Sequence, residues 1–149
     1  MSEHAIRLVR TIRASATDLY KAWTDPSIMK RWLADVVEAD AQVGGTYRLE
    51  LHARDGSLRE LSGAYEVLEP AARIVMTYSD IDVQPELHQA EQVAVTFKKL
   101  AATVTELELV HGWNGQPMTD TERRSLEASW GSRLDRLVDG VELPSTLDG

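Results

Sequence analysis

Cysteine is absent from the sequence, so the chain has neither a disulfide nor a thiol nucleophile. The first residues, which include Glu3, His4 and Arg7, also lack the basic and then apolar pattern of a secretory leader. No apolar run is long enough to span a bilayer, and the mean hydropathy of -0.29 agrees with that absence. From these absences we expect a cytoplasmic protein with no membrane span.

Basic residues are in the minority, with 16 Lys and Arg against 24 Asp and Glu. The net charge of -8 repels polyanions over the screening length, so we expect no nucleic-acid partner. The four histidines, at positions 4, 52, 88 and 111, do not have the spacing of metal ligands. Gly44-Gly45 lacks the further glycines and the lysine of a phosphate-binding loop. We therefore expect neither a metal ion nor a cofactor.

The remaining composition is ordinary for a globular protein, with 43% hydrophobic and 27% charged residues. A chain of 149 residues has the size of one domain and is long enough to bury a real core. We expect a single domain over residues 1–149, with a structured core at about 6–141 and a tail at 142–149.

Two short helices are expected after an opening strand. Residues 6–13 alternate imperfectly between apolar and polar positions, as a strand does. Ser15 then begins a segment with the spacing of a capping box, which predicts a short helix. Asp25 can cap a second helix over residues 26–33, which has proline in its first turn.

Residues 36–113 have the pattern of successive strands, interrupted by Gly-Gly, Asp-Gly and Glu-Pro turns. Such short connections favour an antiparallel meander. Residues 80–92 are acidic with scattered apolar positions and predict a mobile loop, while 98–102 predict a hairpin connection. At 74–78 both faces are apolar, so a one-residue shift in register would exchange the buried and exposed faces. The predicted dry face carries Tyr47, Leu49, Leu51, Leu61, Gly63, Tyr65, Val67, Ile74, Met76, Tyr78, Val93, Val95, Phe97, Leu107, Leu109 and His111.

A long amphipathic helix is predicted from about Thr119 to Gly140. Thr119 and Glu122 form a capping box at its start, and Gly140 and Pro144 are expected to end it. Its apolar stripe should lie across the dry face of the sheet. That stripe consists of Leu126, Trp130, Leu134, Leu137 and Val141.

Several ordered motifs resemble those of a known family. They are Ala22-Trp23-Thr24-Asp25-Pro26, Lys30-Arg31-Trp32, Val43-Gly44-Gly45-Thr46-Tyr47-Arg48, Asp55-Gly56, His111-Gly112-Trp113 and Trp130-Gly131. With them the chain resembles the Hsp90-ATPase-activator-like proteins, a branch of the Bet v 1-like, START-like superfamily, over about residues 6–141. The resemblance implies an α+β helix-grip fold, in which a curved antiparallel sheet wraps around a long C-terminal helix, with two short helices after the first strand. A cavity between sheet and helix is part of that architecture.

The sequence departs from the family pattern at two positions. Ala16 stands where members usually carry proline, so the chain enters its first helix with less rigidity. Val110 precedes His111 where members often have a Thr-x-His-like arrangement, so the match there covers the histidine only.

Placing the dry faces of the strands opposite the stripe of the last helix predicts a ligand-binding cavity. Residues 80–92 would form a movable rim. The predicted lining residues are Tyr47, Leu49, Tyr65, Met76, Tyr78, Phe97, Leu109, His111, Trp113, Trp130 and Leu134.

Each candidate also has a purely structural interpretation. His111 could act as an acid or base or bind a ligand, but we favour a hydrogen-bonded histidine lining the core. Trp23 and Trp32 are interpreted as core anchors, whereas Trp113 and Trp130 are expected near the cavity. The strand tyrosines can offer hydroxyls to a ligand, yet tyrosines in half-buried strands need no function.

Three functions in different classes follow. The first is binding of a small apolar or aromatic molecule, which the resemblance and the predicted lining both support. The second is an enzyme of the kind found among related polyketide cyclases and dehydratases, with His111 as its candidate catalytic residue. The third is a partner of an Hsp90-type chaperone, ranked last because those activators carry an additional amino-terminal domain for which we expect no room here. The resemblance also suggests a homodimer.

Overall fold

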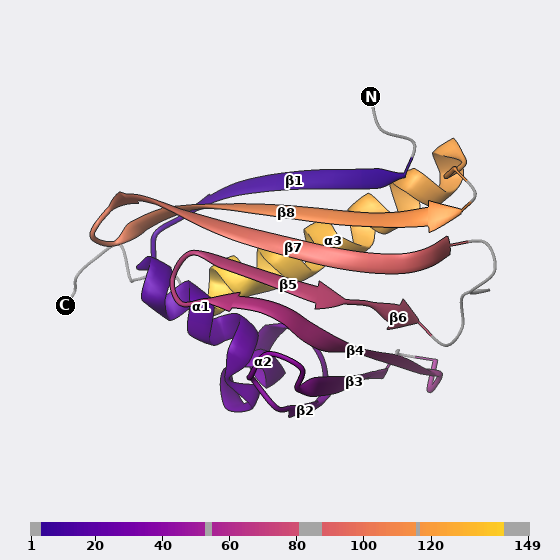
Figure 1. Ribbon diagram of the computed structural model, residues 1–149, viewed down its shortest axis with the longest axis horizontal. Coiled ribbons are helices and arrows are strands. Elements are labelled where there is room, and N and C mark those ends of the chain that lie inside the picture. Colours follow the sequence, from indigo (N-terminus) through magenta and orange to yellow (C-terminus); the bar gives the residue numbers. More distant parts are fainter. Residues whose placement is uncertain (1–3, 53–54, 81–87, 116, 142–149) are drawn as a thin grey trace.

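The computed structural model describes residues 4–52, 55–80, 88–115 and 117–141. Within these residues, one sheet of eight strands runs through the molecule, and three helices accompany it (Figure 1). The elements are β1 (Ala5–Ile12), α1 (Ala16–Thr24), α2 (Pro26–Trp32), β2 (Val36–Ala39), β3 (Thr46–His52), β4 (Leu58–Glu69), β5 (Arg73–Thr77), β6 (Ser79–Asp80), β7 (His88–Ala101), β8 (Val104–Gly115) and α3 (Asp120–Val141).

The sheet has the strand order β1-β8-β7-β5-β4-β3-β2, with the short β6 paired to β4, and every pairing is antiparallel. Helix α3 crosses one face of this curved sheet (Figure 1). Its C-terminal end lies near α1 and α2, and its N-terminal end lies near the end of β8 (Figure 1). This is the helix-grip arrangement that the resemblance implies.

The two short helices begin where their caps predict. The Ser15 Oγ accepts the Asp18 backbone N–H at 3.1 Å, and the Asp25 carboxylate accepts the Ser27 N–H at 2.9 Å. Each bond satisfies a donor that the first turn of a helix would otherwise leave without a partner.

Helix α3 has a reciprocal cap. The Thr119 Oγ1 accepts the Glu122 N–H at 3.1 Å, and the Glu122 carboxylate accepts the Thr119 N–H at 2.9 Å. The predicted span, about Thr119 to Gly140, agrees with α3 to within one residue at each end, since the helix runs from Asp120 to Val141. Pro144 lies outside the described residues. One glycine in the last turn costs only about 1 kcal/mol of helix propensity, which packing elsewhere along α3 offsets.

The helix tryptophans anchor the core as predicted. Trp23 and Trp32 are 0% and 2% exposed, and their rings meet edge to face with centroids 4.7 Å apart. The Trp32 indole N–H donates to the Ala22 carbonyl at 2.8 Å, so its polar atom is satisfied inside the core.

Two features of the sheet differ from the sequence prediction. A bulge in β4 between Tyr65 and Val67 shifts the alternation of faces, so Leu68 rather than Val67 packs against the core. The β7–β8 turn is also tighter than predicted, because β7 continues to Ala101.

The predicted loop over residues 80–92 is wrong at both of its ends. Asp80 belongs to β6, and residues 88–92 belong to β7, where His88, Gln89 and Gln92 pair with the end of β8. Pairing with a neighbouring strand satisfies the backbone there whatever the polarity of the side chains. The middle of the segment, 81–87, lies outside the described residues.

Candidate functional site

A pocket of about 340 Å³ lies between the sheet and the N-terminal half of α3. We call it the aromatic pocket. Strand residues form one wall, and successive turns of α3 form the other. Its lining consists of Arg59, Tyr78, Glu91, His111, Trp113, Met118, Thr121, Glu122, Ser125, Leu126 and Ser129.

His111 is the fully buried polar residue of this wall, with 0% of its surface exposed. Its Nδ1 lies 2.9 Å from the Trp130 Nε1, and its Nε2 lies 2.8 Å from a Glu91 carboxylate oxygen. An indole N–H can only donate, so Nδ1 accepts the bond from Trp130. The ring proton is therefore on Nε2, from which it is donated to Glu91.

The imidazole is held in place by aromatic rings as well as by hydrogen bonds. The Tyr78 ring meets it edge to face with centroids 4.6 Å apart, and Trp113 does the same at 6.2 Å. Trp130 stacks in turn on Trp23, with centroids 6.1 Å apart. His111 thus belongs to a rigid aromatic cluster that joins the pocket wall to the core.

This arrangement agrees with the interpretation of His111 as a hydrogen-bonded core residue. Both ring nitrogens are engaged by protein groups, and a bound molecule would have to displace Trp130 or Glu91 to exchange a proton with the ring. The side chain is therefore suited to shaping the pocket and orienting its neighbours.

Of the eleven residues predicted to line a cavity, Tyr78, His111 and Trp113 line the aromatic pocket. The others lie in the buried core and are not among its lining residues. These are Tyr47, Leu49, Tyr65, Met76, Phe97, Leu109, Trp130 and Leu134.

The two buried tyrosines illustrate why the interior is filled. The Tyr47 hydroxyl donates to the Thr77 carbonyl at 2.6 Å, and the Tyr65 hydroxyl donates to the Trp23 carbonyl at 3.2 Å. Burial raises the pKa of Tyr65 to about 12 and raises the pKa of Tyr47 still further. Both hydroxyls therefore remain neutral and act as hydrogen-bond donors to backbone carbonyls.

Sequence reasoning missed Glu91, because that residue fell within the predicted loop. A signal was available: Glu91, Val93, Val95 and Phe97 alternate along one face, and extending the dry face of β7 backwards would have brought Glu91 inside. The polar lining from α3, such as Ser125 and Ser129, carried no comparable signal, since helix serines are common on exposed faces.

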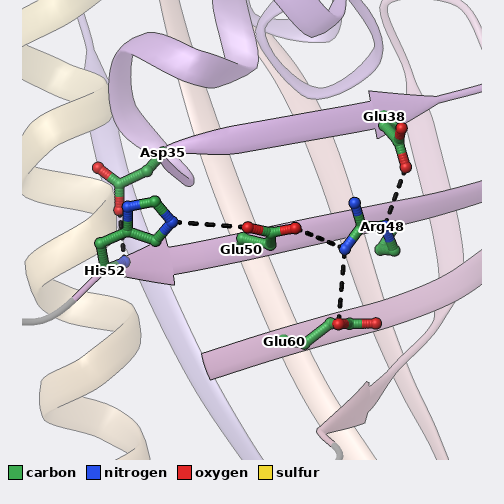
Figure 2. Close-up of polar contacts among 6 residues, drawn as sticks. All are labelled: Asp35, Glu38, Arg48, Glu50, His52 and Glu60. Carbon is green, nitrogen blue, oxygen red and sulfur yellow. Dashed lines mark hydrogen bonds and ion pairs between the residues drawn. The ribbon is translucent and has the colours of Figure 1, made fainter. Parts of the chain in front are cut away.

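A second polar cluster lies on the outer face of β2, β3 and β4 (Figure 2). It joins Asp35, Glu38, Arg48, Glu50, His52 and Glu60. Arg48 stands at its centre with three carboxylates, at 2.9 Å, 2.7 Å and 3.5 Å. The hydrogen bonds that Arg48 donates to Glu38 and Glu50 raise the pKa of Arg48, and the bond to Glu50 lowers the pKa of that carboxylate.

This outer cluster is a surface ion-pair network across three strands, of a kind that stabilises little when exposed. Over the described parts of the chain, no group of three His, Asp or Glu side chains could hold a metal ion. Nor does any helix there have the length and apolar character needed to cross a membrane.

Comparison with known proteins adds to this geometry. The family model described as "Activator of Hsp90 ATPase homolog 1-like protein" matches residues 13–142. None of the curated proteins matches the sequence.

Solved structures share the fold. A crystal structure of a Chromobacterium violaceum protein is 26% identical, with a TM-score of 0.79 over 95% of this chain and 99% of that one. DynU16, from the dynemicin biosynthetic locus, is 24% identical, with a TM-score of 0.75 over 91% of this chain and 46% of that one. The solution structure of the Aha1 dimer from Colwellia psychrerythraea is 18% identical, with a TM-score of 0.74 over 95% and 98% of the two chains.

Proposed function

The chain belongs to the family of activator of Hsp90 ATPase homolog 1-like proteins, and we propose that it binds a small apolar or aromatic molecule in the aromatic pocket. The observation that carries this proposal is a space of about 340 Å³ lined by Tyr78, Trp113, Met118 and Leu126 together with seven polar or charged side chains. That volume is near the lower end of the roughly 300–1,000 Å³ found for small-molecule sites. A ligand of one or two rings fits it better than a long acyl chain.

An enzyme of the cyclase or dehydratase kind is the weaker alternative. It is supported by the similarity to DynU16, a protein from a biosynthetic locus. Catalysis would require a group able to move protons, and His111 is the buried candidate at the pocket. Its bonds to Trp130 and Glu91 occupy both ring nitrogens, so binding is favoured over turnover.

A role as a chaperone partner ranks third; it is supported by the family description and by structural neighbours described as Aha1 and as an Hsp90 activator. The Colwellia relative is a dimer, and we extend a homodimer to this chain as part of the proposal. Light scattering of the purified protein tests that extension. A cytoplasmic location stays a prediction.

Calorimetric titration with uncharged 2-naphthamide tests the binding proposal. We expect saturable binding at one site. Ser125→Phe should abolish it, because Ser125 lines the pocket from an exposed position on α3 and a phenyl ring there would fill the space. Ala128→Phe places the same ring on an exposed position of α3 outside the lining and should leave binding unchanged. Equal binding by both variants would refute the pocket as the site.

A further inference from the structure

Arg133 is a buried cation within the apolar stripe of α3. It follows Trp130 by one helical turn, and only 3% of its surface is exposed. Its guanidinium carbon lies 4.6 Å from the centre of the Trp130 ring, which provides a cation–π contact. Arg133 thus adjoins the same indole that donates to His111.

No carboxylate of the described residues neutralises this cation. Within residues 4–52, 55–80, 88–115 and 117–141, Arg133 forms no ion pair and no hydrogen bond. The contrast with Arg48 is direct, because Arg48 is much more exposed and yet has three carboxylates around it (Figure 2). Burying a charge without a counter-ion is costly, and an anion that reached this guanidinium would supply the pairing that the described residues do not.

Arg133 lines a second space of about 300 Å³, which we call the cationic pocket. Its lining consists of Leu51, His52, Ser57, Arg59, Ser129, Ser132, Arg133 and Arg136. Three of these residues are arginines, and neither Asp nor Glu is among them. The charged side chains of this lining are thus basic, in a chain whose net charge is -8.

The cationic pocket adjoins the aromatic pocket. Arg59 and Ser129 line both, so the two spaces meet along these side chains. A molecule that occupied both spaces would pass Ser129 on its way to Arg133. Along that path the lining changes from the aromatic side chains of the first pocket to the arginines of the second.

We propose that the ligand of this protein is an amphipathic anion, with its apolar or aromatic body in the aromatic pocket and an anionic oxygen group, carboxylate or phosphate, bound by Arg133. The guanidinium presents a planar fork of N–H donors that matches such a group. The serine hydroxyls of the lining can donate further hydrogen bonds to it, and Arg136 adds a second positive charge at the solvent side. This inference rests on the proposed function and gives the chemical class of its ligand.

Three probes of matched shape test the inference: 2-naphthamide, 2-naphthoate and 2-naphthyl phosphate, each titrated calorimetrically into the full chain. At least one anionic probe should bind about tenfold or more tightly than the neutral amide, as charge-assisted hydrogen bonds to a buried arginine require. The affinities of the two anionic probes distinguish a carboxylate ligand from a phosphate ligand. Arg133→Met should abolish the preference while retaining affinity for the amide. Arg124→Met removes the same charge from an exposed position on α3 outside both linings and should leave the preference intact.

The outcomes separate the two proposals. If all three probes bind the wild-type chain equally, the anionic group is refuted while the aromatic pocket stands. If none binds, the proposed function itself fails. A preference that survives in Arg133→Met refutes Arg133 as its source. Should that variant not fold, Arg136→Met, at an exposed position of the same pocket, should lower the preference at least threefold, and an unchanged preference would overturn the inference.

Discussion

The hydrogen bond between Trp130 and His111 can be measured by a double-mutant cycle. Both side chains are at most 1% exposed, and the Nε1–Nδ1 distance is 2.9 Å. Trp130→Phe leaves Nδ1 buried without a donor, and His111→Leu leaves the indole N–H buried without an acceptor. An unsatisfied buried polar group costs about 1–3 kcal/mol in each case, in addition to the lost packing.

The double variant removes both polar groups, so neither is left unsatisfied. Its loss in free energy of unfolding should therefore be smaller than the sum of the two single losses by about 1–3 kcal/mol. Glu91 loses its partner in both His111 variants, and that effect cancels in the cycle.

Urea unfolding followed by far-ultraviolet circular dichroism is the suitable assay, because tryptophan fluorescence changes with the mutation itself. Equal m-values in all four proteins validate the comparison. Single losses that add to within about 0.5 kcal/mol would show no coupling. That result would refute the assigned tautomer and, with it, the reason for ranking binding above catalysis.

Three further predictions concern stability and binding. Trp32→Ala should cost about 3–5 kcal/mol of unfolding free energy, since it removes a 2%-exposed ring, whereas a change below about 1 kcal/mol would contradict its place in the core. The contribution of Tyr65 to stability should be fully present below pH 10 and should be lost as the pH rises towards 12. The reason is that Tyr65 of the unfolded chain ionises at the ordinary Tyr pKa of 10.0, whereas burial holds its pKa in the folded protein at about 12. Tyr65→Phe should reduce this alkaline loss of stability, and an identical pH profile would refute the prediction. A neutral naphthoquinone should quench tryptophan fluorescence saturably, and Trp113→Phe, in the pocket wall, should lose more of that quenching than Trp32→Phe, which lies outside it.

The sequence was sufficient to predict most of the architecture. Helix starts are local: Ser15, Asp25 and Thr119 each satisfy backbone donors within three residues, so their role is visible without a tertiary structure. Alternation of apolar residues likewise placed Tyr47 and Leu49 on the buried face of their strand. A bulge is not visible in such a pattern, which is why the prediction failed at Val67.

The pocket was decided by tertiary packing. Alternation predicts which side chains point inward, but not whether they meet and fill the space between sheet and helix. Tyr47 and Tyr65 point inward as predicted, and their hydroxyls bond to backbone carbonyls from other elements, so they became core.

Glu91 and Arg133 show the same division more sharply. Each occupies a position that periodicity assigns to the inside, although its charge argues for the surface. Only the folded structure brings Glu91 to within 2.8 Å of His111 and leaves Arg133 buried over the Trp130 ring, with no carboxylate partner among the residues described. The local sequence pattern predicts whether a side chain points into the protein or towards solvent. The partner of a buried charge, however, comes from residues distant in sequence, and that partner determines what the site can bind.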